Sequence, residues 1–176
     1  CSGWTSSEVL QSRWGSDYAA NMQRLQSLAA RTGQTVLLYN GQPAAACYHA
    51  ISSGHTEASQ NVWGGQLPYL CGVDSAWDKF ADGYEVTIQY SAEQVRTALE
   101  ELGLTPDDSP ESWVGASTWD KAGYVRTLEL CGQMVSGLEV RKALDLRSTC
   151  FAIAWRGGQF VITTRGYGHG VGLSQY

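Results

Sequence analysis

The sequence predicts an α+β fold with a mainly antiparallel sheet and several short helices. Stretches with apolar residues at helical spacing alternate with short runs rich in β-branched and aromatic residues. Pairs such as Asn40-Gly41 and Gly157-Gly158 mark tight turns between neighbouring strands. We expect a single domain over residues 1–176, with a helical lead-in over 1–34 and a motif-bearing core over 35–176.

The N-terminal part predicts two helices and a hairpin. Thr5–Glu8 has capping-box spacing and indicates the start of a short helix. Apolar residues recur at helical spacing between Tyr18 and Ala29, which predicts a longer one. A strand over 35–39, the Asn40-Gly41 turn and a return strand over 44–49 then form the predicted hairpin.

The rest of the chain alternates between strands and helices. Ser91–Gln94 and Ser136–Glu139 have the spacing of capping boxes and predict helices that continue through Leu102 and Leu144. Strands are expected at 83–90, 113–118, 124–131, 150–155 and 159–164, with turns at 120–123 and 156–158.

Composition excludes some classes of function. The net charge is −5 and no Lys/Arg run occurs, which argues against nucleic acid as a partner. No apolar run approaches the roughly 20 residues of a membrane span. Because the sequence begins abruptly at Cys1, we interpret it as a fragment and expect membrane contact only through an N-terminal anchor outside it. Few charges and 11% aromatic residues suit an aromatic-lined groove for sugar rings.

Metal and nucleophile motifs are missing. The three His residues and five Cys residues form no H-E-x-x-H or C-x-x-C pattern, so we predict no metal site within this chain. The Cys pattern favours buried thiols that act as small apolar residues, and the odd count leaves at least one unpaired. The G-x-S-x-G motif of many serine hydrolases is also absent.

The first segment that could carry chemistry is Ser52–Glu57, in a stretch over 52–70 without periodicity. Partial desolvation among small residues could raise the pKa of Glu57, as a general acid requires. The alternative is a solvated or hydrogen-bonded loop carboxylate, and composition alone favours that alternative.

The second segment contains Trp63, Tyr69 and Trp77, which could form stacking platforms for sugars. Asp74 and Asp78 could anchor sugar hydroxyls. A satellite cluster of aromatic residues, with the Asp residues capping turns, explains the same pattern equally well.

The third segment, Arg165–Tyr176, has Gly at alternate positions, which frees the backbone for positive φ and close approach to a ligand. Tyr167 and His169 are its reactive side chains, and we expect it to lead from a strand into a helix. A nucleotide-binding loop is the rival interpretation, but the spacing fits neither G-x-G-x-x-G nor the P-loop.

Together these segments resemble the SpoIID family (stage II sporulation protein D) and its amidase-enhancer relative LytB. Ser53–Glu57 corresponds to the family's S-G-G-x-T-E, with His55 in place of the second Gly. The resemblance also rests on 61–64, 68–70, 74–78, 144–148 and the closing 166–176.

This resemblance implies an extracytoplasmic lytic transglycosylase of the cell envelope, acting in sporulation, engulfment or wall remodelling. Such enzymes cut the bond between N-acetylmuramic acid and N-acetylglucosamine in peptidoglycan strands stripped of peptides by a partner amidase or endopeptidase. A Glu protonates the glycosidic oxygen, and the C6 hydroxyl of the muramic acid closes a 1,6-anhydro ring. The resemblance places the usual acid in an Ala-rich helix preceding the region of Cys1. We expect no cofactor within this chain, but some family members carry zinc ligands just before this point, so Cys1 could complete a zinc site with upstream residues in the full-length protein.

Within this chain, the resemblance implies Glu57 as an acid or supporting carboxylate, with Tyr167 and His169 positioning or polarising the sugars. The alternative, from a different class, is a non-catalytic glycan-binding module that enhances a partner amidase. The candidate substrate-binding residues are Ser53, Gly54, Thr56, Trp63, Tyr69, Asp74, Trp77, Gly168, Gly170 and Gln175.

Overall fold

The computed structural model describes residues 4–33 and 35–176, which divide into two compact units, Cys1–Ala45 and Ala46–Tyr176. The expectation of a single domain remains a prediction. Each unit is described by itself. The first contains α1 (Ser7–Trp14), a 3-10 turn (Gly15–Asp17), α2 (Tyr18–Thr32), β1 (Leu38–Tyr39) and β2 (Gln42–Pro43).

Local signals determine the structure of the first unit. Ser6, rather than Thr5, caps α1, because its hydroxyl accepts from the Val9 amide at 3.4 Å. Asn40 and Gly41 both have positive φ, at 51° and 75°, as a two-residue hairpin turn requires. None of the described side chains of this unit is buried, so its helices and hairpin enclose no core of their own.

The predicted return strand over 44–49 was wrong. The hairpin ends at β2, with one further bond from the Ala44 amide to the Leu37 carbonyl. Tyr48–His49 forms a separate strand, β3, which belongs to the second unit and pairs elsewhere. The other elements of that unit are α3 (Ser59–Trp63), η2 (Ala76–Phe80), β4 (Glu85–Ser91), α4 (Ala92–Glu101), η3 (Pro110–Ser112), β5 (Val114–Trp119), β6 (Val125–Leu130), β7 (Gln133–Ser136), α5 (Gly137–Ala143), β8 (Phe151–Arg156), β9 (Gln159–Arg165) and β10 (Leu173–Ser174).

Two three-stranded antiparallel sheets form the frame of this unit, as the α+β prediction requires. Their strand orders are β4-β9-β8 and β5-β6-β7. Strand β7 was not predicted from the sequence. It follows β6 through a tight turn in which Cys131 and Gly132 both have positive φ, at 49° and 76°. Gly132 was the available signal for this turn.

The hydrophobic core joins both sheets to two helices, of which α4 contacts β4 and β9 and α5 contacts β6 and β7. Both helices begin with the predicted capping boxes, at Ser91 and Ser136. Phe160 and Ile162 of β9 are fully buried, and the Trp113 ring stacks on Phe160 at 5.7 Å between centroids. The side chains of a strand alternate between its two faces, so Thr163 and Arg165 lie on the opposite, outer face.

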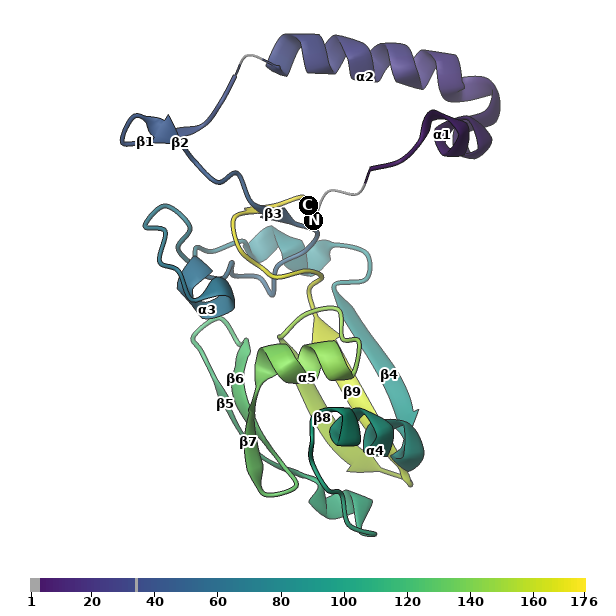
Figure 1. Cartoon of the computed structure of the whole chain (residues 1–176), viewed down its shortest axis with the longest axis vertical. Helices are drawn as coiled ribbons and strands as arrows, with labels where there is room; N and C mark the ends of the chain where they lie inside the picture. The colour runs from purple at the N-terminus through teal and green to yellow at the C-terminus, as the bar shows by residue number, and fades with distance from the viewer. Residues whose placement is uncertain (1–3, 34) are drawn as a thin grey trace. The chain divides into compact units, whose positions relative to one another are not determined.

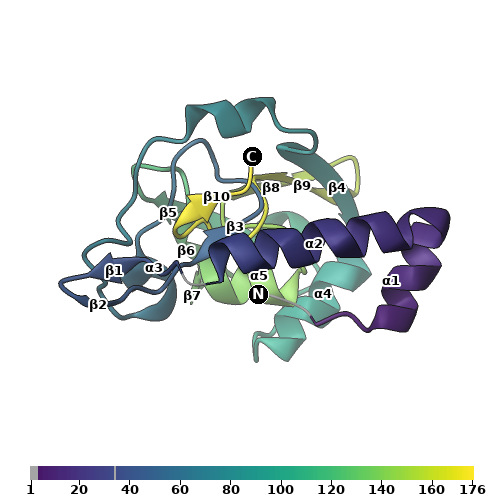
Figure 2. The same cartoon turned by 90° about the horizontal axis from the view of Figure 1, so that it is seen from above.

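The Gly-rich segment does not lead into a helix, contrary to the prediction. It ends in β10, which pairs in parallel with β3, and Figure 2 shows the two strands side by side. The backbone bonds run from the Leu173 amide to the Cys47 carbonyl and from the Gln175 amide to the His49 carbonyl, both at 3.0 Å. Gly at alternate positions suits such close backbone pairing better than it suits a helix.

Candidate functional site

The structure joins the first and third motif segments along their backbones. Ile51 and Tyr167 exchange two bonds, at 3.0 and 2.7 Å, and the Glu57 amide donates to the Gly170 carbonyl at 2.7 Å. Two segments far apart in the sequence therefore form one continuous surface.

Gly170 shows why this junction needs glycine. Its φ is +76°, and a Cβ built there would lie 2.5 Å from the Tyr124 hydroxyl and 3.2 Å from the Glu57 Cβ. Any larger side chain would separate the two segments or displace Tyr124.

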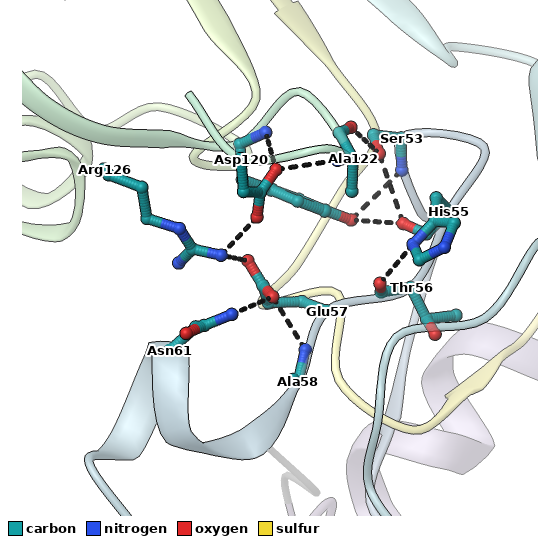
Figure 3. A network of polar contacts seen from close by, with 10 residues as sticks. Ser53, His55, Thr56, Glu57, Ala58, Asn61, Asp120, Ala122 and Arg126 are labelled. Atoms are coloured by element: carbon teal, nitrogen blue, oxygen red, sulfur yellow. Dashed lines mark hydrogen bonds and ion pairs between the residues drawn. The ribbon is translucent and has the colours of Figure 1, made fainter. Parts of the chain in front are cut away.

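Glu57 lies at the centre of a polar network (Figure 3) and is only 3% exposed. Its Oε1 accepts from the Ala58 amide at 2.7 Å and from the Asn61 side-chain amide at 2.8 Å. Its Oε2 accepts from Arg126 at 2.5 Å. Both carboxyl oxygens are therefore occupied by partners within the chain.

Arg126 bridges two carboxylates, because the nitrogen that binds Glu57 also binds Asp120. The other oxygen of Asp120 accepts from the Ala122 and Tyr124 amides, each at 2.9 Å. One guanidinium thus ties the buried end of the first motif to the turn before β6. We define Glu57, Arg126 and Asp120 as the Glu57 network.

Tyr124 connects this network to the first motif. Its hydroxyl accepts from the Ser53 amide at 3.2 Å and donates to the His55 carbonyl at 3.0 Å. Burial raises the pKa of Tyr124 to about 12, so the phenol stays neutral and keeps both bonds.

The pKa of Glu57 is raised above its ordinary value. Burial of the carboxyl is the largest cause, and the neighbouring Asp120 carboxyl acts in the same direction. Bonds from Asn61 and Ala58 and the charge of Arg126 oppose the shift without cancelling it. The carboxyl therefore holds a proton more readily than a surface Glu, yet in this arrangement it presents neither oxygen to a ligand.

His169 lies between a buried histidine and an exposed tryptophan. Its ring centroid is 5.0 Å from that of Trp63 and 5.9 Å from that of His49. Its Nδ1 accepts from the Val171 amide at 3.0 Å, which requires the neutral ring with its hydrogen on Nε2. Burial and the neighbouring His49 and Arg141 lower the pKa of His169, which favours that neutral ring.

His49 is 4% exposed, and burial lowers its pKa as well. Its Nδ1 lies 3.2 Å from the Val171 carbonyl, which assigns the hydrogen to Nδ1. Within the described part of the chain, its Nε2 has no hydrogen-bond partner.

The remaining predicted site residues divide into buried and exposed groups. Ser53, Gly54 and Thr56 are buried, and Gly168 and Tyr69 are partly buried. On the exposed side, Trp77 is 77% exposed and contacts the Phe80 ring at 5.9 Å between centroids. The others that face solvent are Trp63, Asp74, Tyr167 and Gln175.

Asp78 does not present its carboxylate to solvent, as hydroxyl binding would require. It is 2% exposed and accepts from the Ser52 amide at 2.6 Å and the Ser75 hydroxyl at 3.1 Å. Burial opposes ionisation of this carboxyl, but the bonds from Ser52, Ser174 and Ser75 outweigh it and lower the pKa of Asp78. The turn-capping alternative describes this residue.

Sequence reasoning missed Arg126, Tyr124 and the role of Asp120. Asp120 was assigned only to a turn, which it does form, and Arg126 belongs to no motif. The available signal was weak, because Arg126 is one of two charged residues in the strand Val125–Leu130, and Glu129 is the other.

The described residues hold no ready-made metal centre. Across 4–33 and 35–176, no three His, Cys, Asp or Glu side chains gather closely enough to hold an ion. Cys1, through which the resemblance implied zinc, lies outside the described residues. The other four cysteines are free: Cys150 is buried, Cys47 and Cys131 are partly buried, and Cys71 is exposed, so only Cys150 matches the expected buried thiol. None of the described helices has the length and apolar character needed to cross a membrane.

Comparison with known proteins identifies relatives of this chain, although no family model matches it. It is 34% identical over 174 residues to stage II sporulation protein D of Bacillus subtilis (strain 168). It is 36% identical over 174 residues to the protein of the same name from Bacillus amyloliquefaciens. Each alignment covers 98% of this chain and 49% of the relative, so the chain spans about half the length of these curated relatives. The amidase enhancer of Bacillus subtilis is 35% identical over 88 residues, which is 50% of this chain and 11% of that protein.

The fold and the site define an α+β domain in which a Ser-Gly-His-Thr-Glu segment pairs with a Gly-rich segment over a buried carboxylate–guanidinium network. This combination of fold and paired motifs, together with the relatives, defines the class of domain. Over 98% of its length the chain is similar to proteins named stage II sporulation protein D, and this similarity supports that family.

Proposed function

We propose that this chain is the glycan-binding core of a lytic transglycosylase of the bacterial cell wall. The enzyme would cleave the bond between N-acetylmuramic acid and N-acetylglucosamine in peptide-stripped strands and leave 1,6-anhydro ends. It would act outside the cytoplasm, during sporulation or another remodelling of the wall. The names of the relatives support a sporulation role, and one relative is named for enhancing an amidase.

One observation carries the proposal: exposed aromatic rings lie on the Gly-rich segment and on the short helix that follows the first motif. Trp63, at the end of the short helix that follows Glu57, is 51% exposed, and Tyr167 of the Gly-rich segment is 49% exposed. The Arg147 guanidinium lies over the Tyr167 ring at 4.4 Å, which holds the ring in place. Exposed, positioned rings are what a sugar face stacks on.

We assign Glu57 the role of a positioning carboxylate. Its bonds to Ala58 and Asn61 hold the first turn of α3, and α3 carries Trp63. The general acid would come from a part of the whole protein that lies outside this sequence. That acid protonates the glycosidic oxygen, the C6 hydroxyl attacks the anomeric carbon and loses its proton, and the neighbouring sugar leaves with a free C4 hydroxyl.

The occupied carboxyl of Glu57 also favours a second candidate, a non-catalytic glycan-binding module. In that case the protein would bind strands and stimulate a partner amidase without cutting the glycan itself. The two candidates share the binding surface and differ only in the product that they leave.

Glu57→Gln in the whole protein tests these assignments. We expect fewer 1,6-anhydro ends by mass spectrometry of digested strands, by less than about a hundredfold, together with weaker strand binding. Loss of more than about a hundredfold with unchanged binding would instead make Glu57 the proton donor.

Glu100→Gln, on the exposed face of α4, is the matched control and should change neither quantity. A parent protein that binds strands but makes no 1,6-anhydro ends would establish the second candidate. A parent protein that binds no glycan would overturn both candidates.

A further inference from the structure

A groove of about 740 Å³ lies on the outer face of the β4-β9-β8 sheet. This volume is within the range that binds small ligands, roughly 300–1,000 Å³. Its sides include Ser53 of the first motif, Ala122 of the turn before β6, and Trp119. Apart from Ser53, none of the residues that line it was predicted to bind substrate.

Two of the charged groups in the groove form an ion pair, and a third does not. Arg165 and Glu85 are cross-strand partners and bind each other at 2.8 Å, so their charges offset. Lys79 also lines the groove and is exposed, and it has no acidic partner among the ion pairs of the described chain. The groove therefore carries one uncompensated positive charge.

Gly54 fixes the path of the Lys79 side chain. Its φ is +97°, and a Cβ built there would overlap the Lys79 stem, with Cγ at 3.2 Å and Cδ at 3.3 Å. The absence of a side chain at Gly54 lets the stem lie against the backbone of the first motif, beside the groove that Lys79 lines.

Trp119 supplies an apolar surface beside this charge. It is the last residue of β5 and is 56% exposed. The facing sheet contributes small or polar side chains, Ala152 and Thr163, which leave room for a flat ring. The groove thus combines an aromatic ring, small or polar side chains that can lie against hydroxyl groups, and one cation. This combination is complementary to a sugar ring that bears a carboxylate.

We propose that this groove is a binding subsite for an anionic sugar residue, with the Lys79 ammonium recognising its carboxylate and Trp119 stacking on its ring. The inference rests on the proposed function, and it names the chemical group of the substrate that the protein recognises, a free carboxylate. N-acetylmuramic acid carries a lactyl carboxylate that is free only when no peptide is attached. An attached peptide converts that group into a neutral amide, so this groove distinguishes stripped strands from peptide-bearing ones.

The groove is also connected to the Glu57 network through a hydrogen bond. Ser53 donates its hydroxyl hydrogen to the Ala122 carbonyl at 2.9 Å, and Ala122 follows the turn residue Asp120, which binds Arg126. A strand seated in the groove would thus contact the same turn that anchors the buried network.

The test compares three ligands by calorimetric titration of the full chain: peptide-free glycan strands, the same strands with the carboxylates converted to methyl amides, and N-acetylglucosamine oligomers. We expect Lys79→Gln to weaken binding of the free-carboxylate strands about tenfold. Binding of the two neutral ligands should stay unchanged, and Lys79→Arg should restore most of the lost affinity. Lys142→Gln, an exposed lysine of α5 outside the groove, is the control.

Equal affinity of the parent chain for free and amidated strands would overturn this inference and leave the proposed glycan binding intact. A Lys79→Gln variant that loses affinity for all three ligands alike would also overturn it, because the lysine would then be a structural support. Failure of the parent to bind any of the three would count against the proposed function itself.

Discussion

The Glu57 network and the groove beside Lys79 meet at the same turn, residues 120–123, but hold their charges in opposite ways. Inside the network, one guanidinium faces two carboxylates, and the Glu57 side chain is 4% exposed. In the groove, the Arg165–Glu85 pair is about half exposed, at 54% and 49%, and Lys79 remains unpaired. Charges of the first kind maintain a shape, whereas charges of the second kind are available to a ligand.

This difference separates the motif from the residues that we propose to contact ligand. The Ser53–Glu57 segment is largely turned inward, where its carboxylate and backbone hold the junction with the Gly-rich segment. Exposed groups such as Trp63, Lys79 and Trp119 lie on elements positioned by that junction or beside it. The motif therefore indicates where the scaffold is fixed more directly than it indicates which atoms would contact the proposed sugar ligand.

The largest expected effect breaks the network at its cation. Arg126→Met leaves Glu57 and Asp120 facing each other without a counter-charge, which should lower the free energy of unfolding by about 3–5 kcal/mol. Arg165→Met removes the cation of the exposed pair and should cost less than about 1 kcal/mol. Urea unfolding at neutral pH measures both variants, and similar losses would show that the two regions do not differ.

The same variant has a defined pH dependence. Because the pKa of Glu57 is raised in the folded chain, the folded state binds more protons than the unfolded state between the two pKa values. Its contribution to stability is present below the ordinary pKa of a Glu and is lost as pH rises through the folded value. Removing Arg126 raises that value further, so Arg126→Met should regain part of its lost stability as the pH is lowered from 7.5 toward 5.

The next effect tests the junction between the motifs with two glycines of similar φ. Gly158→Ala, at +81° in an open turn, meets nothing within 4 Å and should cost about 1–2 kcal/mol from the backbone alone. Gly170→Ala, at +76°, adds the clash with Tyr124 and Glu57 and should cost about 1–3 kcal/mol more. Thermal unfolding of the two variants measures the difference in unfolding free energy. Equal losses would mean that the junction accommodates the added methyl group without strain.

Much of the fold could be predicted because its signals are local. The capping boxes at Ser91 and Ser136, the Asn40-Gly41 turn and the alternating strands β4, β8 and β9 all appeared where expected. The errors arose where pairing between distant segments decides the structure. Nothing local to Tyr48–His49 indicates that it pairs with Leu173–Ser174, and this pairing also prevents the helix predicted after the Gly-rich segment.

The candidate site was predictable only in part for the same reason. Motif spacing identified Glu57, Tyr167 and His169, whereas Arg126 became visible only when the fold brought β6 to the first motif. The pairing of Lys79 with the gap left by Gly54 likewise depends on a backbone conformation that spacing does not encode.

The smallest expected effect on stability concerns two tryptophans of similar exposure, Trp63 at 51% and Trp119 at 56%. Trp63→Ala loses the contact with the His169 ring and should lower the unfolding free energy by about 0.5–1.5 kcal/mol. Trp119→Ala, an exposed position, should stay within about 0.5 kcal/mol.

Binding of peptide-free strands should weaken for both variants by a similar amount, about 0.5–1.5 kcal/mol, because each ring offers a sugar one stacking face. Trp63→Ala would then lower both the unfolding free energy and the affinity, because its ring also contacts His169. Trp119→Ala would lower the affinity alone, because its ring lines the groove and supports little else. Fluorescence-independent titration, such as calorimetry, is needed because both substitutions remove a fluorophore. If Trp119→Ala binds as tightly as the parent while Trp63→Ala does not, strands use the joined motif surface alone and the groove on the outer face of the sheet binds no sugar.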